Sequence, residues 1–125
     1  MTTILYVVAA ESNIRDGIIE FANVGQTDRT VEERLRDGDY ARKAGGGNWN
    51  ILAQFDITGH ADHAVHSILR KRGFAINPRN TANTEEVRFG LTAQQTIDAV
   101  AASVNELLRG VARPDSYGMR PEQEA

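Results

Sequence analysis

The chain has 125 residues, of which 41% are hydrophobic, and a formal net charge of -3. This length predicts one domain with a core large enough to fold without disulfides or a structural metal. Because the chain has no cysteine, a disulfide framework, a thiolate zinc site and a cysteine nucleophile are excluded, and a cytoplasmic location is expected. The small negative charge argues against a protein that coats nucleic acid non-specifically. The basic residues between Arg70 and Arg88 nevertheless predict a local positive surface.

The N-terminal segment predicts a hairpin of two strands. Residues 4–10 are apolar and rich in β-branched side chains, which indicates a buried strand. The segment has no basic region and its apolar run stops at Glu11, so neither a signal peptide nor a membrane span is expected. After a loop over 12–17, residues 18–24 predict a second strand that ends at Gly25 and pairs antiparallel with the first.

A short helix is predicted next from its capping signal. Thr30 and Glu33 have the spacing of a capping box, in which each side chain bonds the backbone amide of the other residue. Val31 and Leu35 are one turn apart and are expected to face the core, and Gly38 predicts the end of the helix.

The middle of the chain alternates between strand and helix patterns. A glycine-rich loop over 42–48 precedes a clean alternation over 49–57, which predicts a third strand. From His60 the apolar residues follow a helical period up to Gly73, and residues 74–83 are expected to be irregular. The polar face of this helix is expected to carry His63, His66 and Arg70.

The last elements complete the expected domain. Residues 84–89 predict a short strand, and Thr92 with Gln95 forms a second capping box that opens an apolar-faced helix. We therefore expect a domain over 1–110 and a flexible tail over 111–125. The element order predicts the α+β class, with a small central, mainly antiparallel β-sheet flanked by helices.

The order of several short motifs resembles that of a GIY-YIG nuclease domain, specifically a phage and bacterial branch in which the two tripeptides are loosely kept. The match spans roughly Thr3 to Leu108. Its landmarks in chain order are Ile4-Leu5-Tyr6 for GIY, Asn23-Val24-Gly25 for YIG, Val31-Glu32-Glu33-Arg34-Leu35 for the arginine helix, His66 for the recurrent histidine, and Thr84-Glu85-Glu86-Val87-Arg88-Phe89 for the TEWF-type segment.

This resemblance implies an endonuclease that hydrolyses DNA phosphodiester bonds with Mg²⁺ or Mn²⁺ as its cofactor. It implies that Tyr6 helps to activate the attacking water, that Arg34 braces the phosphate, and that Glu85 binds the metal. A free tyrosine titrates near ~10, so this role requires a cation such as Arg34 or the metal to lower the pKa of Tyr6. Asn23 and Gly25 are implied to shape the site, the asparagine amide by holding water or phosphate and the glycine by letting backbone approach closely.

Each residue also has a plainer interpretation. Without the resemblance, Tyr6 would be interpreted as a half-buried core tyrosine. Arg34 would be interpreted as a solvated ion-pair residue, and Glu85 as a carboxylate that keeps an edge strand soluble. His66 is implied to contact phosphate or transfer protons, and a partly exposed histidine on the polar face is equally well supported. Since His60, His63 and His66 drift around the helix, no zinc site is expected.

Glu86 is the competing metal ligand. Neighbouring strand residues point to opposite faces, so only one of Glu85 and Glu86 can serve. Glu85 is favoured, and it is expected to share its face with Val87 and Phe89.

Asn23 supports a rival expectation, because a GIY-YIG domain normally has tyrosine there and an amide cannot supply a phenolate. The rival is a catalytically degenerate DNA-binding or protein-interaction module on the same fold, and a third, weaker alternative is an enzyme of unrelated chemistry. DNA is the expected partner, with RNA left open, and a homodimer or a larger recognition partner is expected to help. No membrane association is expected, and a phage or mobile element is one expected setting.

Overall fold

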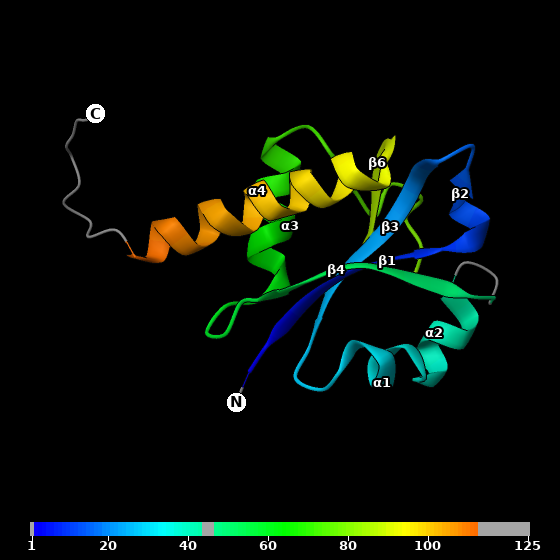
Figure 1. The fold of residues 1–125 in the computed structure, drawn as a ribbon, viewed down its shortest axis with the longest axis horizontal. Coiled ribbons are helices and arrows are strands. Elements are labelled where there is room, and N and C mark those ends of the chain that lie inside the picture. Colours follow the sequence, from blue (N-terminus) through cyan, green and yellow to red (C-terminus); the bar gives the residue numbers. More distant parts are fainter. Residues whose placement is uncertain (1, 44–46, 113–125) are drawn as a thin grey trace.

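Six strands form one antiparallel sheet in a computed structural model that describes residues 2–43 and 47–112 (Figure 1). The sheet order is β4-β1-β3-β6-β5, and β2 pairs with β3 outside this path. The strands are β1 (Ile4–Ala10), β2 (Ile14–Arg15), β3 (Ile18–Thr27), β4 (Trp49–Asp56), β5 (Ala75–Ile76) and β6 (Glu86–Thr92). Together with the flanking helices, this sheet confirms the predicted α+β class.

Helices cover both faces of the sheet. Helices α1 and α2 lie against one face, and helices α3 and α4 lie against the other (Figure 1). Their bounds are α1 (Val31–Leu35), α2 (Gly38–Arg42), α3 (Asp62–Lys71) and α4 (Ala93–Ala112), and a short 3-10 helix spans Glu11–Asn13. In the described part of the chain, none of the helices combines the length and the apolar character that crossing a membrane requires.

The alternation of side chains along β1 divides the interior into two cores. Val8 and Tyr6 point toward α1 and α2, where they pack with Val31 and Tyr40. The larger core lies on the face of α3 and α4 and contains Leu5, Val7, Ala9, Ile19, Ala22, Val24, Ile57, Val65, Leu69, Val87, Phe89, Val100 and Val104. The two faces of the sheet therefore differ: the core under α3 and α4 is larger and mainly apolar, and the smaller core under α1 and α2 contains the buried hydroxyls of Tyr6 and Tyr40.

The predicted hairpin is present, with antiparallel pairing of β1 and β3. Its connection differs from the expected loop, because a 3-10 helix and β2 fold back before a two-residue turn at Asp16 and Gly17. Both turn residues have positive φ, 55° and 77°, the backbone that a tight two-residue hairpin turn requires. The second strand also passes through Gly25 instead of ending there, and continues to Thr27.

Both predicted capping boxes are formed. At α1, the Thr30 hydroxyl accepts from the Glu33 amide at 3.1 Å, and the Glu33 carboxylate accepts from the Thr30 amide at 3.1 Å. At α4, Thr92 and Gln95 bond in the same reciprocal way.

Three boundaries were predicted wrongly. Gly38 does not end a helix but begins α2, with Asp37 as its N-cap residue in extended backbone. The last strand begins at Glu86 instead of Thr84, and α4 continues through Ala112. Most of the tail expected over 111–125 lies outside the described residues.

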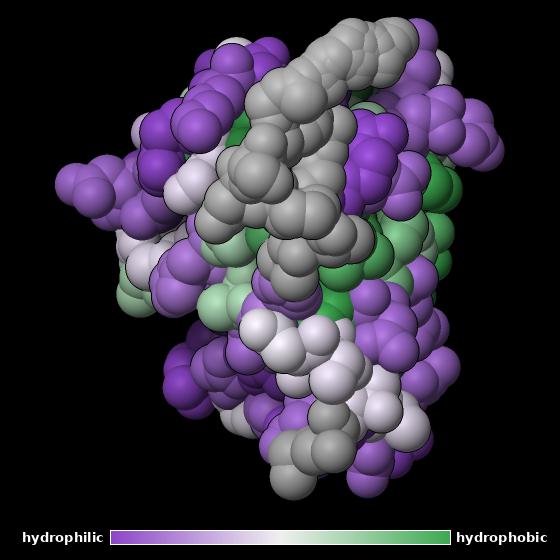
Figure 2. Space-filling view, turned by 90° about the vertical axis from the view of Figure 1, so that its left-hand side faces the viewer, coloured by the Kyte–Doolittle hydropathy of each residue, from purple (hydrophilic) through white to green (hydrophobic). Residues whose placement is uncertain are grey.

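The surface seen in Figure 2 is mainly hydrophilic, with hydrophobic side chains gathered in small groups between the polar ones. Among the described residues, the exposed large hydrophobic side chains are Ile18 and Leu108, each 38% exposed. Single exposed apolar side chains of this kind are ordinary on a protein surface.

Candidate active site

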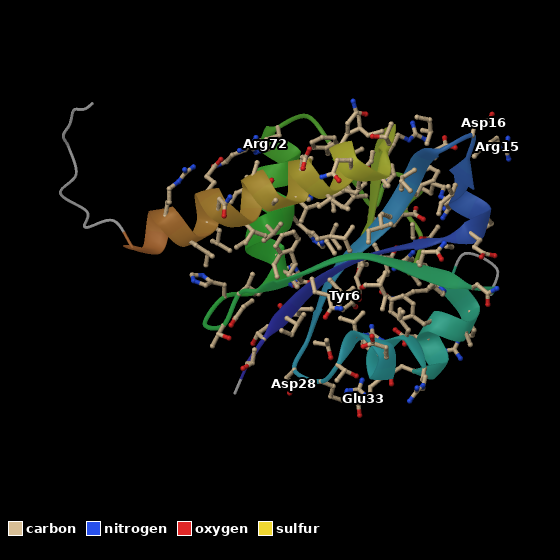
Figure 3. All side chains as sticks on the ribbon, in the orientation of Figure 1. Tyr6, Arg15, Asp16, Asp28, Glu33 and Arg72 are labelled. Atoms are coloured by element: carbon tan, nitrogen blue, oxygen red, sulfur yellow. The ribbon has the colours of Figure 1, made fainter. Side chains whose placement is uncertain are left out.

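Three of the residues singled out from the sequence meet on the face of the sheet that α1 and α2 cover. The Tyr6 hydroxyl donates a hydrogen bond to Glu85 Oε1 at 2.7 Å, although the two residues are 79 positions apart. Arg34 Nη2 donates to Glu85 Oε2 at 3.2 Å across 51 positions. Figure 3 shows Tyr6 between the sheet and helices α1 and α2. Strand β1, helix α1 and the turn before β6 thus each place one side chain at a common point.

Gly25 makes this meeting possible. It is the register partner of Tyr6 on the neighbouring strand β3. A Cβ atom at this position would overlap the Glu85 carboxylate and would lie 2.5 Å from Tyr6 Oη. The expected close approach is therefore present, although the neighbours are side-chain atoms of the protein itself.

The expected face of Glu85 was wrong. Val87 and Phe89 point into the core under α3 and α4, whereas Glu85 bonds Tyr6 on the opposite face. Glu85 precedes β6, in a turn, so its side chain does not follow the alternation of the strand. Its backbone carbonyl still accepts from the Val24 amide at 2.9 Å, which ties the turn to β3.

Glu86 is bound elsewhere. Its side chain is 3% exposed and accepts from Arg79, with 3.0 Å between Arg79 Nε and Glu86 Oε1. The Arg79 guanidinium also lies over the Phe21 ring, 4.0 Å from its centroid. Of the two neighbouring glutamates, Glu85 is the one that lies beside Tyr6 and Arg34.

Acidic side chains hold Arg34 in place. Asp39 accepts from both terminal nitrogens of Arg34, at 2.8 and 3.0 Å, and Asp37 accepts at 3.1 Å. The bond to Asp39 is the main reason why the pKa of Arg34 is raised, and Arg34 in turn holds the pKa of Asp39 well below its usual range. Arg34 is thus charged and already paired, and a phosphate would have to compete with these carboxylates.

A second tyrosine in the site was not found from the sequence. Tyr40 lies on α2, is 1% exposed, and donates from its hydroxyl to Glu85 Oε1 at 2.6 Å. Its hydroxyl is 3.2 Å from Tyr6 Oη and accepts from Asn23 Nδ2 at 3.2 Å. The sequence carried no signal for this residue, because the predicted end of the helix at Gly38 left Tyr40 in a loop.

Asn23 has both ends of its amide occupied by protein groups. It is 1% exposed and exchanges two hydrogen bonds with Asn83, at 2.9 and 3.0 Å. Its nitrogen also reaches Tyr40, so it orders the interior of the site instead of holding water or phosphate as expected. Asn83, in the loop before Glu85, is a further residue that the sequence did not indicate.

His66 was expected on the polar face of α3, but it lies on the buried side of this helix. It is 7% exposed, and its Nε2 lies 2.6 Å from the carbonyl oxygen of Val24. Position 66 lies three residues before the buried Leu69, so it shares that side of the helix. His66 therefore fixes the strand beneath Gly25 and contacts none of Tyr6, Arg34 and Glu85 through the hydrogen bonds of the described residues.

The local charges change the expected acidity of Tyr6. Burial of the hydroxyl and the neighbouring charge of Glu85 raise the pKa of Tyr6 well above its usual value. Arg34 opposes this effect, but its influence is smaller. The role expected for Tyr6 requires a cation that lowers its pKa, and Arg34 alone does not achieve this.

A cleft of about 680 Å³ opens beside these residues. Lys43 lies on its wall, with its Nζ 3.6 Å from Glu85 Oε2 and 3.4 Å from Asp39 Oδ2. The other basic residues that line the cleft are Arg34, Arg42 and Arg79. A second hollow, of about 400 Å³, lies on the other side of Arg34 and includes Gln26 and Arg29.

The positive surface expected between Arg70 and Arg88 is divided. Arg72 pairs with Glu106 at 3.0 Å, and Arg79 pairs with Glu86. Arg88 lies over the Phe21 ring, 5.1 Å from its centroid. Of Arg72, Arg79 and Arg88, the cleft of about 680 Å³ is lined by Arg79. Its other basic lining residues include Arg34 of α1 and Arg42 of α2.

The carboxylates that line the cleft belong to Asp39, Glu85 and Glu86, and Asp39 and Glu86 are each paired with an arginine. Within residues 2–43 and 47–112, no group of three or more His, Cys, Asp or Glu side chains is arranged to hold a metal ion. Magnesium in phosphate-handling sites is commonly held by one or two carboxylates together with substrate phosphates. Both oxygens of Glu85 already accept hydrogen bonds, from Tyr6 and Tyr40 at Oε1 and from Arg34 at Oε2, so a metal ion bound there would have to replace some of these contacts.

No family model, curated protein or solved structure matches the chain.

Proposed function

We propose that the chain is a metal-dependent endonuclease that hydrolyses DNA phosphodiester bonds at the cluster of Tyr6, Arg34 and Glu85. The observation that carries this proposal is the direct hydrogen bonding of Tyr6 and Arg34 to the two oxygens of Glu85. These residues are separated by up to 79 positions and form one cluster, in which Arg34 and Glu85 line the cleft and Tyr6 is buried behind them. Their resemblance to a GIY-YIG site remains part of the proposal.

Arg34 has the chemistry that such a reaction needs. A guanidinium can donate to two phosphate oxygens at once and stabilise the charge that accumulates on them as water attacks phosphorus. In the proposed reaction, the phosphate replaces Asp39 as the two-point acceptor of Arg34. Lys43 and Arg42, on the same cleft wall, add positive charge for the flanking backbone.

Tyr6 contributes its hydroxyl to the attacking water in this proposal. Its raised pKa means that the hydroxyl is protonated and bonded to Glu85 in the protein alone. Glu85 would hold a divalent ion, whose positive charge would offset the carboxylate that is the second-largest cause of the raised pKa of Tyr6. Attack in line with the leaving oxygen would give a 5′-phosphate and inversion at phosphorus.

Asn23 favours a second candidate, a binding module that has lost turnover. Its amide is locked between Asn83 and Tyr40, and Arg34 is paired with Asp39. Both features are compatible with a rigid site that holds nucleic acid without cutting it. The two candidates differ in whether a metal is required.

The test is nicking of supercoiled and branched DNA by the purified protein with Mg²⁺ or Mn²⁺, with and without chelator. The site variants are Glu85→Gln, which keeps the side-chain size but removes the charge, and Arg34→Lys, which keeps the charge and approximate length. Glu32→Gln and Arg36→Lys are matched controls, because Glu32 and Arg36 are exposed neighbours of Arg34. A single-stranded RNA substrate in parallel identifies the preferred nucleic acid.

We expect metal-dependent cutting that is lost in both site variants and retained in both controls. Losing one contact made in the transition state typically reduces the rate by about 100- to 1000-fold. DNA binding that is independent of metal, without any cutting, would favour the module and contradict the nuclease. Cutting that survives both site variants would place the reaction elsewhere on the molecule.

A further inference from the structure

Tyr40 has its hydroxyl at the centre of the hydrogen-bond network in the candidate active site. The hydroxyl oxygen lies 2.6 Å from Glu85 Oε1 and 3.2 Å from Tyr6 Oη. Asn23 Nδ2 approaches the same oxygen at 3.2 Å. Because an amide NH₂ can only donate, Asn23 occupies a lone pair of Tyr40 and leaves the Tyr40 proton for Glu85 or Tyr6.

The ring of Tyr40 is held firmly, so the position of its oxygen is fixed. Trp49 packs edge-on against it with 4.9 Å between ring centroids. The Arg34 guanidinium and the Lys43 ammonium lie over the ring, 4.7 and 4.2 Å from its centroid. With the ring fixed, the only freedom left to the hydroxyl is rotation of its O–H bond, which can point to either acceptor.

Asn83 extends this arrangement to the loop that carries Glu85. Its side chain exchanges two hydrogen bonds with Asn23, and both asparagines are buried. The line of contacts from Asn83 through Asn23 to Tyr40 connects the loop before β6, strand β3 and helix α2. These hydrogen bonds therefore link three elements that surround the Tyr6 hydroxyl.

We propose that Tyr40, oriented by Asn23, is a positioning residue that orders the Tyr6 hydroxyl and the Glu85 carboxylate for the reaction. This inference rests on the proposed function, and it assigns to α2 a role that the sequence motifs did not indicate. When Glu85 accepts from Tyr40, the carboxylate is fixed in its orientation. When the Tyr40 proton points to Tyr6, it stabilises negative charge on the Tyr6 oxygen.

The charged and titratable groups around Tyr6 come from each element that packs on it. Tyr40 belongs to α2, Arg34 to α1, and Glu85 to the turn before β6, while Lys43 follows α2 and faces Glu85. Glu85 raises the pKa of Tyr6, whereas the hydrogen bond from Tyr40 and the charge of Arg34 lower it. Removing the Tyr40 hydroxyl should therefore make Tyr6 a weaker acid.

The test combines a direct measurement of Tyr6 with a measurement of cleavage in Tyr40→Phe. 3,5-Difluorotyrosine, a more acidic tyrosine, is introduced at position 6 of the full chain, and its ionisation is followed by fluorine NMR as the pH is raised. Ser103→Ala is the matched control, since it deletes a buried hydroxyl whose hydrogen bond, among the described residues, is to the Ala99 carbonyl within α4.

We expect the fluorine titration to move to higher pH in Tyr40→Phe and to stay in place in Ser103→Ala. We also expect cleavage to fall about 10- to 100-fold in Tyr40→Phe, the usual loss when a partner of a metal-binding side chain is removed. An unchanged titration, or cleavage equal to that of the wild type, overturns the role of Tyr40. If the wild-type chain cuts no nucleic acid, the proposed function fails, and the titration alone then decides whether Tyr40 orders Tyr6.

Discussion

The two oxygens of the Glu85 carboxylate have different partners. Oε1 accepts from the hydroxyls of Tyr6 and Tyr40, while Oε2 faces Arg34 and Lys43. Hydrogen bonds to an ionised group are shorter and stronger than those between neutral groups, so these contacts keep the side chain in one orientation. Small changes around Glu85 should therefore have large and specific effects.

Gly25→Ala tests how closely the site is packed. The added methyl group would meet the Glu85 carboxylate and Tyr6 Oη, and neither can move without breaking its hydrogen bonds. Overpacking of this kind costs about 1–3 kcal/mol, so we expect a lower free energy of unfolding in urea and loss of cleavage. Gly38→Ala is the control, because its methyl group would lie 3.8 Å from Arg42 Nη1. Equal stability of the two variants would contradict the close approach.

Asp39→Asn tests whether carboxylates compete with phosphate for Arg34. The pKa of Asp39 is held far below its usual range by Arg34, so this carboxylate is ionised at any practical assay pH. Removing its charge should release Arg34 and tighten DNA binding about fivefold to tenfold, measured by fluorescence anisotropy at fixed salt.

The matched control for that measurement is Asp16→Asn, which changes the net charge equally. Asp16 lies at the turn between β2 and β3, away from Tyr6 (Figure 3). Its positive φ of 55° suits asparagine as well as aspartate. If both variants gain the same affinity, the effect is one of overall charge, and Asp39 does not compete for Arg34.

At the scale of elements, helix α1 depends on its capping box. It has five residues, too few for a helix that is stable by propensity alone, and it carries Arg34. Thr30→Ala removes the hydroxyl that accepts from the Glu33 amide. We expect a loss of about 1 kcal/mol and a Tm lower by about 4 °C, while Thr30→Ser keeps the cap and most of the stability. If Thr30→Ala melts like the wild type, the packing of Val31 holds α1 without its cap.

Periodicity and caps predicted the elements that follow simple rules. The alternation over residues 4–10 and 49–57 located β1 and β4, and Thr30 and Thr92 marked the starts of α1 and α4. These signals are local, so the sequence contains them in full. The errors arose where two local signals conflict. Gly38 is a common helix terminator, but after Asp37 it begins a helix instead.

Individual site residues were predictable only where a motif named them. Tyr6, Arg34 and Glu85 were found from the resemblance, and their side chains do meet. Tyr40 could not be found, because its role depends on how α2 packs on β1, which no local pattern encodes. His66 was misplaced because histidine was treated as polar, although its ring is buried and satisfied by the Val24 carbonyl.

At the scale of the whole molecule, the sheet separates a large, mainly apolar core from the core that contains the candidate site. The apolar core under α3 and α4 contains the larger set of buried side chains. The smaller core under α1 and α2 includes the buried hydroxyls of Tyr6 and Tyr40. Buried polar groups of this kind cost stability unless each has a partner, and here each hydroxyl has one.

Those two tyrosines predict how stability depends on pH. Burial is the main cause, and the Glu85 charge the second, of raised pKa values for both Tyr6 and Tyr40 in the folded protein. In the unfolded chain each titrates near ~10, so above that pH the unfolded state has lost protons that the folded state retains. Their contribution to stability is therefore complete below about pH 10 and is lost progressively as the pH rises further.

Urea unfolding between about pH 8 and 11 measures this effect. We expect the free energy of unfolding of the wild type to fall above about pH 10, and the fall to be smaller in Tyr40→Phe because one of the two groups is gone. The same alkaline loss in Tyr40→Phe and the wild type would show that other groups cause it.

The central claim is that Tyr6, Arg34 and Glu85 act together on a phosphodiester. The most direct measurement is single-turnover cleavage of DNA with Mn²⁺ by Arg34→Lys, Glu85→Gln and the double variant. Residues that act as a unit are strongly non-additive, so we expect each single variant to lose nearly all the rate and the double variant to be little slower. Losses that multiply in the double variant, or a wild-type chain that does not cut, would contradict the claim.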